Sequence, residues 1–204
     1  MDSALLITAF AMLFVVIDPP GLVPMFIALT QGMDPAHRAG MARRACLIAF
    51  ALLTLFGVAG EPVLGFIGIS MPAFRIAGGL LLFLTALDML FERRTQRREG
   101  QHPDPDHDPS VFPLATPLIA GPGAIATMIL LIGQSGPGWI GTFAILSLLG
   151  AMILSTYLFL LASTFFENLL GRTGTLVVTR LLGMLLAALS VQFVIDGIRG
   201  TGLI

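Results

Sequence analysis

The sequence predicts an all-α membrane protein in which six transmembrane helices form two inverted three-helix repeats. Hydrophobic residues make up 56% of the 204 residues and charged residues only 11%. Six apolar segments are long enough to cross a bilayer, and the second half repeats motifs of the first. A soluble domain carries about 25% charged residues because its surface must be wetted. A water-exposed globular protein of this composition is therefore not expected.

Six segments approach the roughly 20 apolar residues that a helix needs to cross the hydrocarbon core. The first has no basic residue ahead of its apolar run, so we interpret it as a transmembrane helix rather than a cleaved signal peptide. The second could end near Ala59, which would leave an apolar hairpin at residues 61–72. The predicted spans are residues 4–30, 44–66, 72–91, 111–133, 139–163 and 176–198.

A polar stretch at residues 92–110 separates a first repeat (1–91) from a second repeat (111–204). Its charge, proline and glycine content predicts a loop inside one membrane domain. The loops after spans one, three and five are rich in arginine, and the positive-inside rule places such loops in the cytoplasm. Both termini are therefore predicted to be periplasmic. The arginines concerned are Arg38, Arg43, Arg44, Arg93, Arg94, Arg97, Arg98 and Arg172.

Three motifs recur in the same order at nearly the same offset. Pro20-Gly21 recurs as Pro122-Gly123 after 102 residues. Glu61-x-x-Leu-Gly recurs as Glu167-x-x-Leu-Gly after 106 residues, and Arg75-x-x-Gly as Arg180-x-x-Gly after 105. Because each unit holds an odd number of spans, the second enters the membrane from the opposite side. Inverted repeats of this kind are typical of secondary transporters, whose substrate site lies near the bilayer midplane.

Asp18 lies near the middle of the first span, where a carboxylate is costly and indicates a functional residue. Pro19 and Pro20 lack backbone N–H groups, and their rings clash with carbonyls one turn earlier. We expect helix 1 to break at the midplane, with Asp18 as the N-cap of the restarted helix and Pro19 at its first position. A simpler interpretation, in which Asp18 only caps a kinked helix, stays open.

Helix 4 repeats the predicted break, at Thr116-Pro117 and Gly121-Pro122-Gly123. The restarted helix should offer free N–H groups and a positive dipole end, which suit a carboxylate. Asp18 would face an ammonium group, so the pair of breaks matches a zwitterionic amino acid with a small side chain. The predicted substrate-binding residues are Asp18, Pro19, Pro20, Gly21, Thr116, Pro117, Gly121, Pro122, Gly123 and Ala124.

Two ion pairs are candidate gates: Glu61 with Arg75 near the outer side, and Glu167 with Arg180 near the inner side. They would close the two sides in turn, or they would only join the two helices of each hairpin. Gly78 and Gly79 more simply permit close helix packing. No catalytic motif or P-loop is present, so we expect no enzyme activity and no cofactor. A single mid-depth carboxylate argues against a metal site.

The chain's expected partners are a small-molecule substrate and the lipid bilayer. A net charge of −1 gives no basic field for nucleic acid. Homo-oligomer formation, the coupling ion and the direction of transport stay open.

Several strings of residues are specific to a known family. DPPGLVPMFIALT, FIGISMPAFRIAGGLLLFLTALDML and PLATPLIAGPGAI together resemble the MarC family of bacterial inner-membrane proteins, over nearly the whole chain. The resemblance implies a relative of the LysE-type exporters, and some relatives are described as transporters of glycine or alanine. A secondary transporter or exporter of small neutral amino acids in the bacterial inner membrane is the leading hypothesis. The alternatives are a non-transporting membrane scaffold, or a channel or carrier for another small solute.

Overall fold

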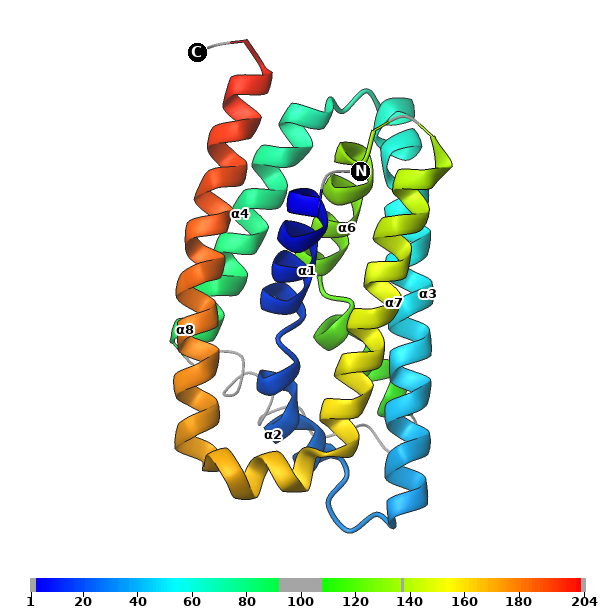
Figure 1. Ribbon diagram of the computed structural model, residues 1–204, viewed down its shortest axis with the longest axis vertical. Helices are drawn as coiled ribbons and strands as arrows, with labels where there is room; N and C mark the ends of the chain where they lie inside the picture. Colours follow the sequence, from blue (N-terminus) through cyan, green and yellow to red (C-terminus); the bar gives the residue numbers. More distant parts are fainter. Residues whose placement is uncertain (1–2, 92–107, 137, 203–204) are drawn as a thin grey trace.

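A computed structural model describes residues 3–91, 108–136 and 138–202, with the backbone alone at positions 3–5, 167, 168, 170 and 172. Every regular element in these ranges is a helix (Figure 1). Within these described ranges, five segments are long and apolar enough to cross a membrane, or six when the bent pair η1–α6 counts as one. The predicted all-α membrane fold is therefore confirmed. The elements are α1 (Ser3–Ile17), α2 (Pro19–Leu29), α3 (Pro35–Ile67), α4 (Met71–Leu90), the π-helical η1 (Ser110–Ile119), α6 (Pro122–Gln134), α7 (Trp139–Leu161) and α8 (Ser163–Gly200).

The second span is longer than predicted. It begins at Pro35, where Asp34 accepts hydrogen bonds from the N–H groups of Ala36 and His37, rather than at residue 44. It continues to Ile67, so the alternative end near Ala59 is wrong. Pro62 lies on an exposed face, where its missing N–H and its ring are tolerated, and Gly68 ends the helix with a φ of +85°. A helix of 33 residues is about 50 Å long, so it extends beyond a hydrocarbon core of about 30 Å.

The last helix is bent near its beginning. Gly171 has a non-helical φ of +60° inside α8, and the membrane-spanning part runs from Thr173 to Gly200. The residues before the bend run across one end of the bundle, from the lower end of α7 to the lower end of α8 in the view of Figure 1. This transverse segment follows directly from α7, because only Ala162 separates the two helices.

The first span and α6 form the centre of the bundle. In the span from Leu6 to Leu29, 56% of the most apolar stretch is buried inside the protein, against 22–33% in the other four single spans. Most residues of α6 are buried as well. The helices α3, α4, α7 and α8 lie around this centre and expose apolar side chains outward (Figure 1). Elements that sequence analysis identified by their prolines are thus the innermost ones.

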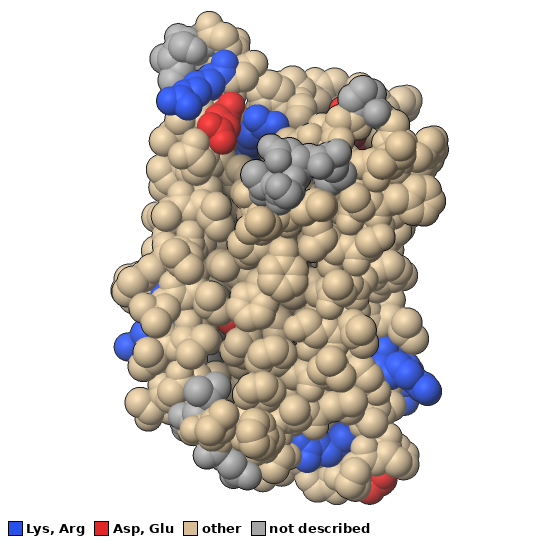
Figure 2. All heavy atoms as spheres, viewed as in Figure 1, with Lys and Arg blue, Asp and Glu red and all other residues tan. Residues whose placement is uncertain are grey.

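The spans alternate in direction (Figure 1). From the N-terminus, α1 and α2 run toward the end of the bundle drawn at the bottom, α3 returns and α4 descends again. The second half begins at this lower end, so η1 and α6 ascend, α7 descends and α8 ascends. Both described ends of the chain lie at the upper end. Figure 2 shows the charged side chains of this face mostly near the two ends, with a broad uncharged band between them.

Glycines bring α4 and α8 into close contact. A Cβ atom on Gly79 would lie 2.8 Å from the carbonyl oxygen of Ser190 and 2.8 Å from Cγ2 of Val194. On the opposite helix, a Cβ on Gly183 would lie 3.0 Å from Cβ of Met89. Small residues let helix backbones approach in membranes, where dispersion contacts drive association. The expectation that Gly78 and Gly79 serve packing is confirmed. Gly79 packs against α8, and a Cβ on Gly78 would lie 3.4 Å from Cβ of Ala126 on α6.

Candidate functional site

The first span is interrupted at Asp18. The helix α1 ends at Ile17, Asp18 has left-handed backbone angles (φ 52°, ψ 62°) and α2 begins at Pro19. Pro19 and Pro20 have no N–H group, so Gly21 supplies the first backbone donor of α2. That N–H donates to Oδ1 of Asp18 over 3.1 Å. The Asp18 side chain is only 2% exposed, so the protein holds a carboxylate inside its apolar centre.

Gly21 is required by this cap. A Cβ atom at position 21 would lie 2.0 Å from Oδ2 of Asp18 and 2.6 Å from its Cγ. Any larger residue would push the carboxylate away from the helix N-terminus. The string Asp-Pro-Pro-Gly is therefore one local unit: the carboxylate caps the helix, the prolines remove two competing donors, and the glycine leaves room.

The second interruption lies between η1 and α6, whose axes differ by 55°. Within η1, Phe112 and Thr116 have extended backbone angles, and the peptide bonds that follow them are cis. Gly121 is the N-cap of α6, Pro122 follows it, and no side chain caps this helix. A Cβ on Gly121 would lie 2.7 Å from the carbonyl oxygen of Pro117, so the chain is folded tightly back on itself here.

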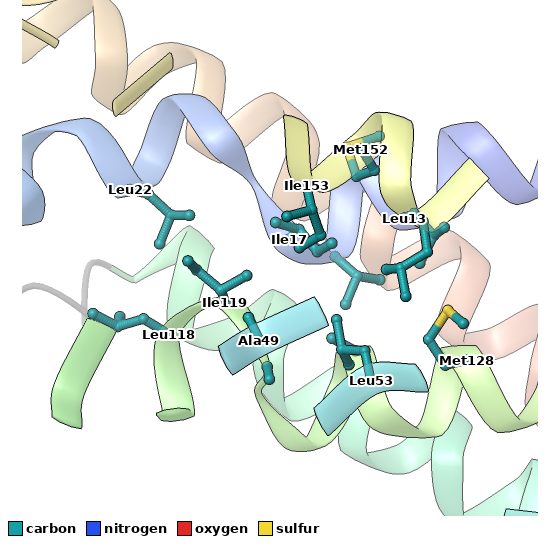
Figure 3. Packing of buried hydrophobic residues seen from close by; sticks show 14 of the residues in the cluster. Leu13, Ile17, Leu22, Ala49, Leu53, Leu118, Ile119, Met128, Met152 and Ile153 are labelled. Carbon is teal, nitrogen blue, oxygen red and sulfur yellow. The ribbon is translucent and has the colours of Figure 1, made fainter. Parts of the chain in front are cut away.

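The two interruptions lie close together. Gly123, in the first turn of α6, is buried, and a Cβ there would lie 3.6 Å from Val16, two residues before Asp18. The same position would lie 3.1 Å from Leu82 and 3.4 Å from the hydroxyl oxygen of Thr85, both on α4. Figure 3 shows the surrounding apolar layer, in which Leu22 of α2 faces Ile119 of η1. A site formed here would take residues from α1, α2, α4 and α6.

The predicted substrate-binding residues of η1 and α6 differ in burial and in position relative to the break. Gly123 and Ala124 are buried at the start of α6, whereas Pro122 is exposed. Thr116 and Pro117 lie inside η1, ahead of the break, and Pro117 is exposed. Thr127, one turn further along α6, bonds back to the carbonyl of Gly123 over 2.8 Å.

Sequence analysis did not identify Thr85, although it is a hydroxyl group in an otherwise apolar run of α4. Its Oγ1 donates to the carbonyl oxygen of Leu81 over 3.0 Å. Such bonds to the preceding turn satisfy a hydroxyl within a membrane helix, so the residue type alone gave no functional signal.

The proposed outer gate pair is not formed. No salt bridge joins Glu61 to Arg75, two residues that the structure describes, and Nε of Arg75 is buried without a hydrogen-bond partner. Oε2 of Glu61 lies instead 3.8 Å from the place of a Cβ on Gly133 of α6. The physical reason is that α3 packs mainly on η1, α6 and α7 rather than along α4. The Glu167 side chain lies outside the described residues, so its pairing with Arg180 stays a prediction.

Charged contacts gather at the lower end of the bundle. Arg38 on α3 donates to the hydroxyl of Ser163 at the start of α8, over 3.1 Å. Arg44 forms a salt bridge of 2.9 Å with Asp108, which also accepts from the N–H and hydroxyl of Ser110 at the start of η1. These bonds, first those from Ser110 and then the charge of Arg44, lower the pKa of Asp108 below its ordinary value. His37 likewise lowers the pKa of Asp34, through a side-chain and a backbone hydrogen bond.

No group of three or more metal-ligating side chains comes together among residues 3–91, 108–136 and 138–202. His102 and His107 of the polar stretch at residues 92–110, which could suggest metal binding but more simply belong to a solvated acidic loop, lie outside these ranges.

Comparison with known proteins gives a match over almost the whole chain. The model of a family described as MarC family integral membrane protein matches residues 3–201. A UPF0056 membrane protein of Methanocaldococcus jannaschii is 38% identical over 98% of both chains. The UPF0056 membrane protein YvbG of Bacillus subtilis is 36% identical, over 98% of this chain and 97% of its own. The UPF0056 inner membrane protein YhgN of Escherichia coli K12 is 34% identical, over 95% and 96%. No solved structure matches the chain.

Proposed function

The chain belongs to the MarC family of integral membrane proteins, and we propose that it is a secondary transporter of small neutral amino acids such as glycine or alanine. The observation that carries the proposal is the meeting of two interrupted helices at the centre of the bundle, with Gly123 beside Val16. Irregular backbone at membrane depth is tolerated only where it is buried in protein or lines a cavity. Discontinuous helices of this kind form the substrate sites of many transporters.

The contacts between elements support two inverted repeats. In the first half, α1 packs on α7, and α2 packs on α7 and α8. In the second half the relation is reversed, since η1 packs on α3, and α6 packs on α3 and α4. The glycine contacts between α4 and α8 are reciprocal to within one residue: Gly183 of α8 meets Met89 of α4, and Gly79 of α4 meets Val194 of α8. Met89 and Val194 are 105 residues apart, and the two glycines are 104 apart. We infer a pseudo-two-fold axis between α4 and α8, with both interruptions at the bilayer midplane.

The chemistry of the two interruptions favours a zwitterion. The buried carboxylate of Asp18 supplies a negative charge at one break. At the other, the first-turn N–H groups of Gly123 and Ala124 have no partner within their own helix and lie at its positive dipole end. An amino acid would place its ammonium toward Asp18 and its carboxylate toward α6. Val16, Leu82 and Thr85 leave little space beside Gly123, which suits a small side chain.

The proposed location is the inner membrane, as the name of YhgN states for that relative. The lower end carries Arg38, Arg43 and Arg44, and by the positive-inside rule it would face the cytoplasm. Both termini would then be periplasmic. The LysE-type relationship, the direction of transport and self-association stay predictions.

Counterflow in proteoliposomes tests the proposal without knowledge of the coupling ion. Vesicles that contain the purified protein are loaded with unlabelled glycine or alanine and diluted into a trace of the labelled amino acid. A carrier gives transient accumulation of label, whereas a channel or a scaffold gives none. The proposed function is wrong if label accumulates neither in vesicles loaded with glycine nor in vesicles loaded with alanine.

The role of Asp18 is tested in the same assay with Asp18→Asn. Asparagine caps helices as well as aspartate does, so the fold is kept while the charge is lost. We expect counterflow to fall by about tenfold or more, the scale of one charge-assisted hydrogen bond. The matched control is Asp88→Asn on α4, which should transport like the unmodified protein. Equal transport by both variants would remove the ammonium site at Asp18.

A further inference from the structure

Arg38 connects three elements from both halves of the chain. Its Nη2 donates to Oγ of Ser163, 125 residues away, over 3.1 Å. Its guanidinium carbon also lies 5.7 Å from the centre of the Phe26 ring. Phe26 belongs to α2, Arg38 to α3 and Ser163 to α8. One side chain therefore connects the half-helix that starts at Asp18 to the second half of the molecule.

Both partners of Arg38 are buried: Ser163 is 0% exposed and Phe26 is 1% exposed. A hydrogen bond from a charged donor is roughly twice as strong as a neutral one, and shielding from water strengthens it further. A guanidinium over an aromatic face adds a second favourable contact. Arg38 is itself only partly exposed, unlike Arg43 on the same helix.

The partners of Arg38 lie at places where the chain can move. Phe26 lies eight residues after Asp18 on the short helix α2, so movement of that helix about its interruption would displace the ring. Ser163 is the first residue of α8, directly after the junction at Ala162 and ahead of the bend at Gly171. Residues beside such junctions absorb hinge motions in other proteins.

The two ends of the bundle differ in their charged contacts. At the lower end, Arg38 contacts Ser163 and Phe26, and Arg44 is paired with Asp108. At the upper end, Glu61 and Arg75, both described, do not form a salt bridge with one another. The hydrogen bond from Arg38 to Ser163, which joins the two halves, thus lies at the lower end, as does the salt bridge between Arg44 and Asp108.

We propose that Arg38 is a latch that holds α2 against α8 and closes the lower end of the bundle in this conformation. The inference rests on the proposed function, because a latch is useful only in a protein that opens alternately to its two sides. When the lower end opens, Arg38 must release Ser163 and Phe26 together, since both contacts use the same guanidinium. Loss of the latch would shift the population toward the conformation open at that end.

Hydrogen exchange of the full-length protein in lipid nanodiscs tests the latch without any substrate. Arg38→Gln should speed amide exchange at residues 22–30 and 163–171 by about tenfold, the factor expected for one charge-assisted hydrogen bond. Exchange at residues 71–90, distant in sequence from the latch, should not change. Arg43→Gln removes the same charge from the same helix, and should leave exchange unchanged because the exposed Arg43 side chain forms no hydrogen bond or salt bridge with the described residues. Arg38→Lys keeps the charge without the planar fork, so its effect should be intermediate.

Two results would overturn the proposal: the same exchange pattern in Arg38→Gln and Arg43→Gln, or a uniform increase over all helices in Arg38→Gln. The first would mean that Arg38 holds nothing, and the second that it only adds general stability. Neither result depends on whether glycine or alanine is transported, so a failure of the latch and a failure of the proposed function are distinguishable.

Labelling of a reporter cysteine in oriented vesicles gives a second measurement. Leu22 lies on α2 between Asp18 and the lower end and is 1% exposed, so Leu22→Cys in a Cys46→Ala background reports opening there. An impermeant maleimide added at the Arg38 side should react about tenfold faster when Arg38→Gln is also present. Equal rates with and without Arg38→Gln would contradict the latch.

Discussion

The two interrupted helices solve the same backbone problem in different ways. At Asp18, a side chain reaches over two prolines to cap the N-terminus of α2. At Gly121, the chain uses backbone alone: no side chain caps α6, and the tight turn presses Gly121 against the carbonyl of Pro117. The geometry of the first break therefore depends on the side chain of Asp18, which a substitution can remove. The geometry of the second depends on the path of the main chain.

This difference also separates their chemistry. The first break carries a negative charge and the second exposes a positive helix end without a charged side chain. If both breaks had carried a carboxylate, the site would suit a cation. Their difference suits a molecule with one charge of each sign. Substitutions at the two breaks should therefore change the free energy of unfolding by unequal amounts.

The largest effect is expected for Gly121→Ala. The new Cβ would lie 2.7 Å from the carbonyl oxygen of Pro117, a backbone atom that cannot rotate away. We expect a loss of about 3 kcal/mol or more in unfolding free energy, as for severe overpacking, measured by thermal unfolding in detergent. Gly65→Ala is the control, because nothing lies within 4 Å of its Cβ position in α3. A Gly121→Ala protein as stable as the control would show that the turn at Pro117 is loose.

Gly21→Ala should cost somewhat less, about 2–3 kcal/mol, because the atoms it meets belong to the Asp18 side chain. The decisive measurement is a double-mutant cycle with Asp18→Gly, which removes those atoms and tolerates the positive φ. In that background Gly21→Ala should cost almost nothing. No comparable side-chain deletion can relieve Gly121→Ala. A cost that persists in the Asp18→Gly background would place the conflict elsewhere.

The local cap at Asp18 was predictable from sequence because its parts are neighbours in the chain. Asp18, Pro19, Pro20 and Gly21 determine one another's geometry over four residues. The meeting of Val16, Leu82 and Thr85 around Gly123 was not predictable, since it depends on how α1, α4 and α6 pack. Glu61 and Arg75 do not form a salt bridge in this conformation for a similar reason: a short connection does not make α3 and α4 packing neighbours. Their role as a gate stays a prediction.

The sequence at the beginning of α3 contains a helix-start pattern that hydropathy does not detect. Asp34-Pro35 has the same cap-and-proline pattern as Asp18-Pro19, yet hydropathy alone placed the span from residue 44. Hydropathy reports which residues lie in lipid, whereas caps report where the helix begins. A helix that extends past the bilayer agrees with both the hydropathy pattern and the cap. Its first turns then carry the arginines that the hydrocarbon core excludes.

Asp18→Ala should be about 2 kcal/mol less stable than the unmodified protein. Alanine loses the cap to Gly21, worth about 1 kcal/mol, and it tolerates the left-handed angles at position 18 poorly, at about 1 kcal/mol. Asp18→Asn should unfold within about 0.5 kcal/mol of the unmodified protein, because asparagine both caps and accepts these angles. Thermal unfolding of the two variants distinguishes the contribution of the cap to stability from the contribution of the charge. Equal stability of Asp18→Ala would mean that the cap contributes nothing.

The smallest effect concerns the carboxylate that precedes the second break. Asp108 lies at the surface, two residues before Ser110, and its hydrogen bonds lower its pKa. A carboxyl with a lowered folded-state pKa stabilises the fold above its unfolded value, near pH 4, and the contribution is lost as the pH falls through the lower folded value. Asp108→Asn should therefore lower the melting temperature slightly at pH 7 and not at about pH 2. Equal melting temperatures of the two proteins at pH 7 would show that the bonds from Ser110, which the acceptor oxygen of asparagine keeps, carry the contribution rather than the charge facing Arg44.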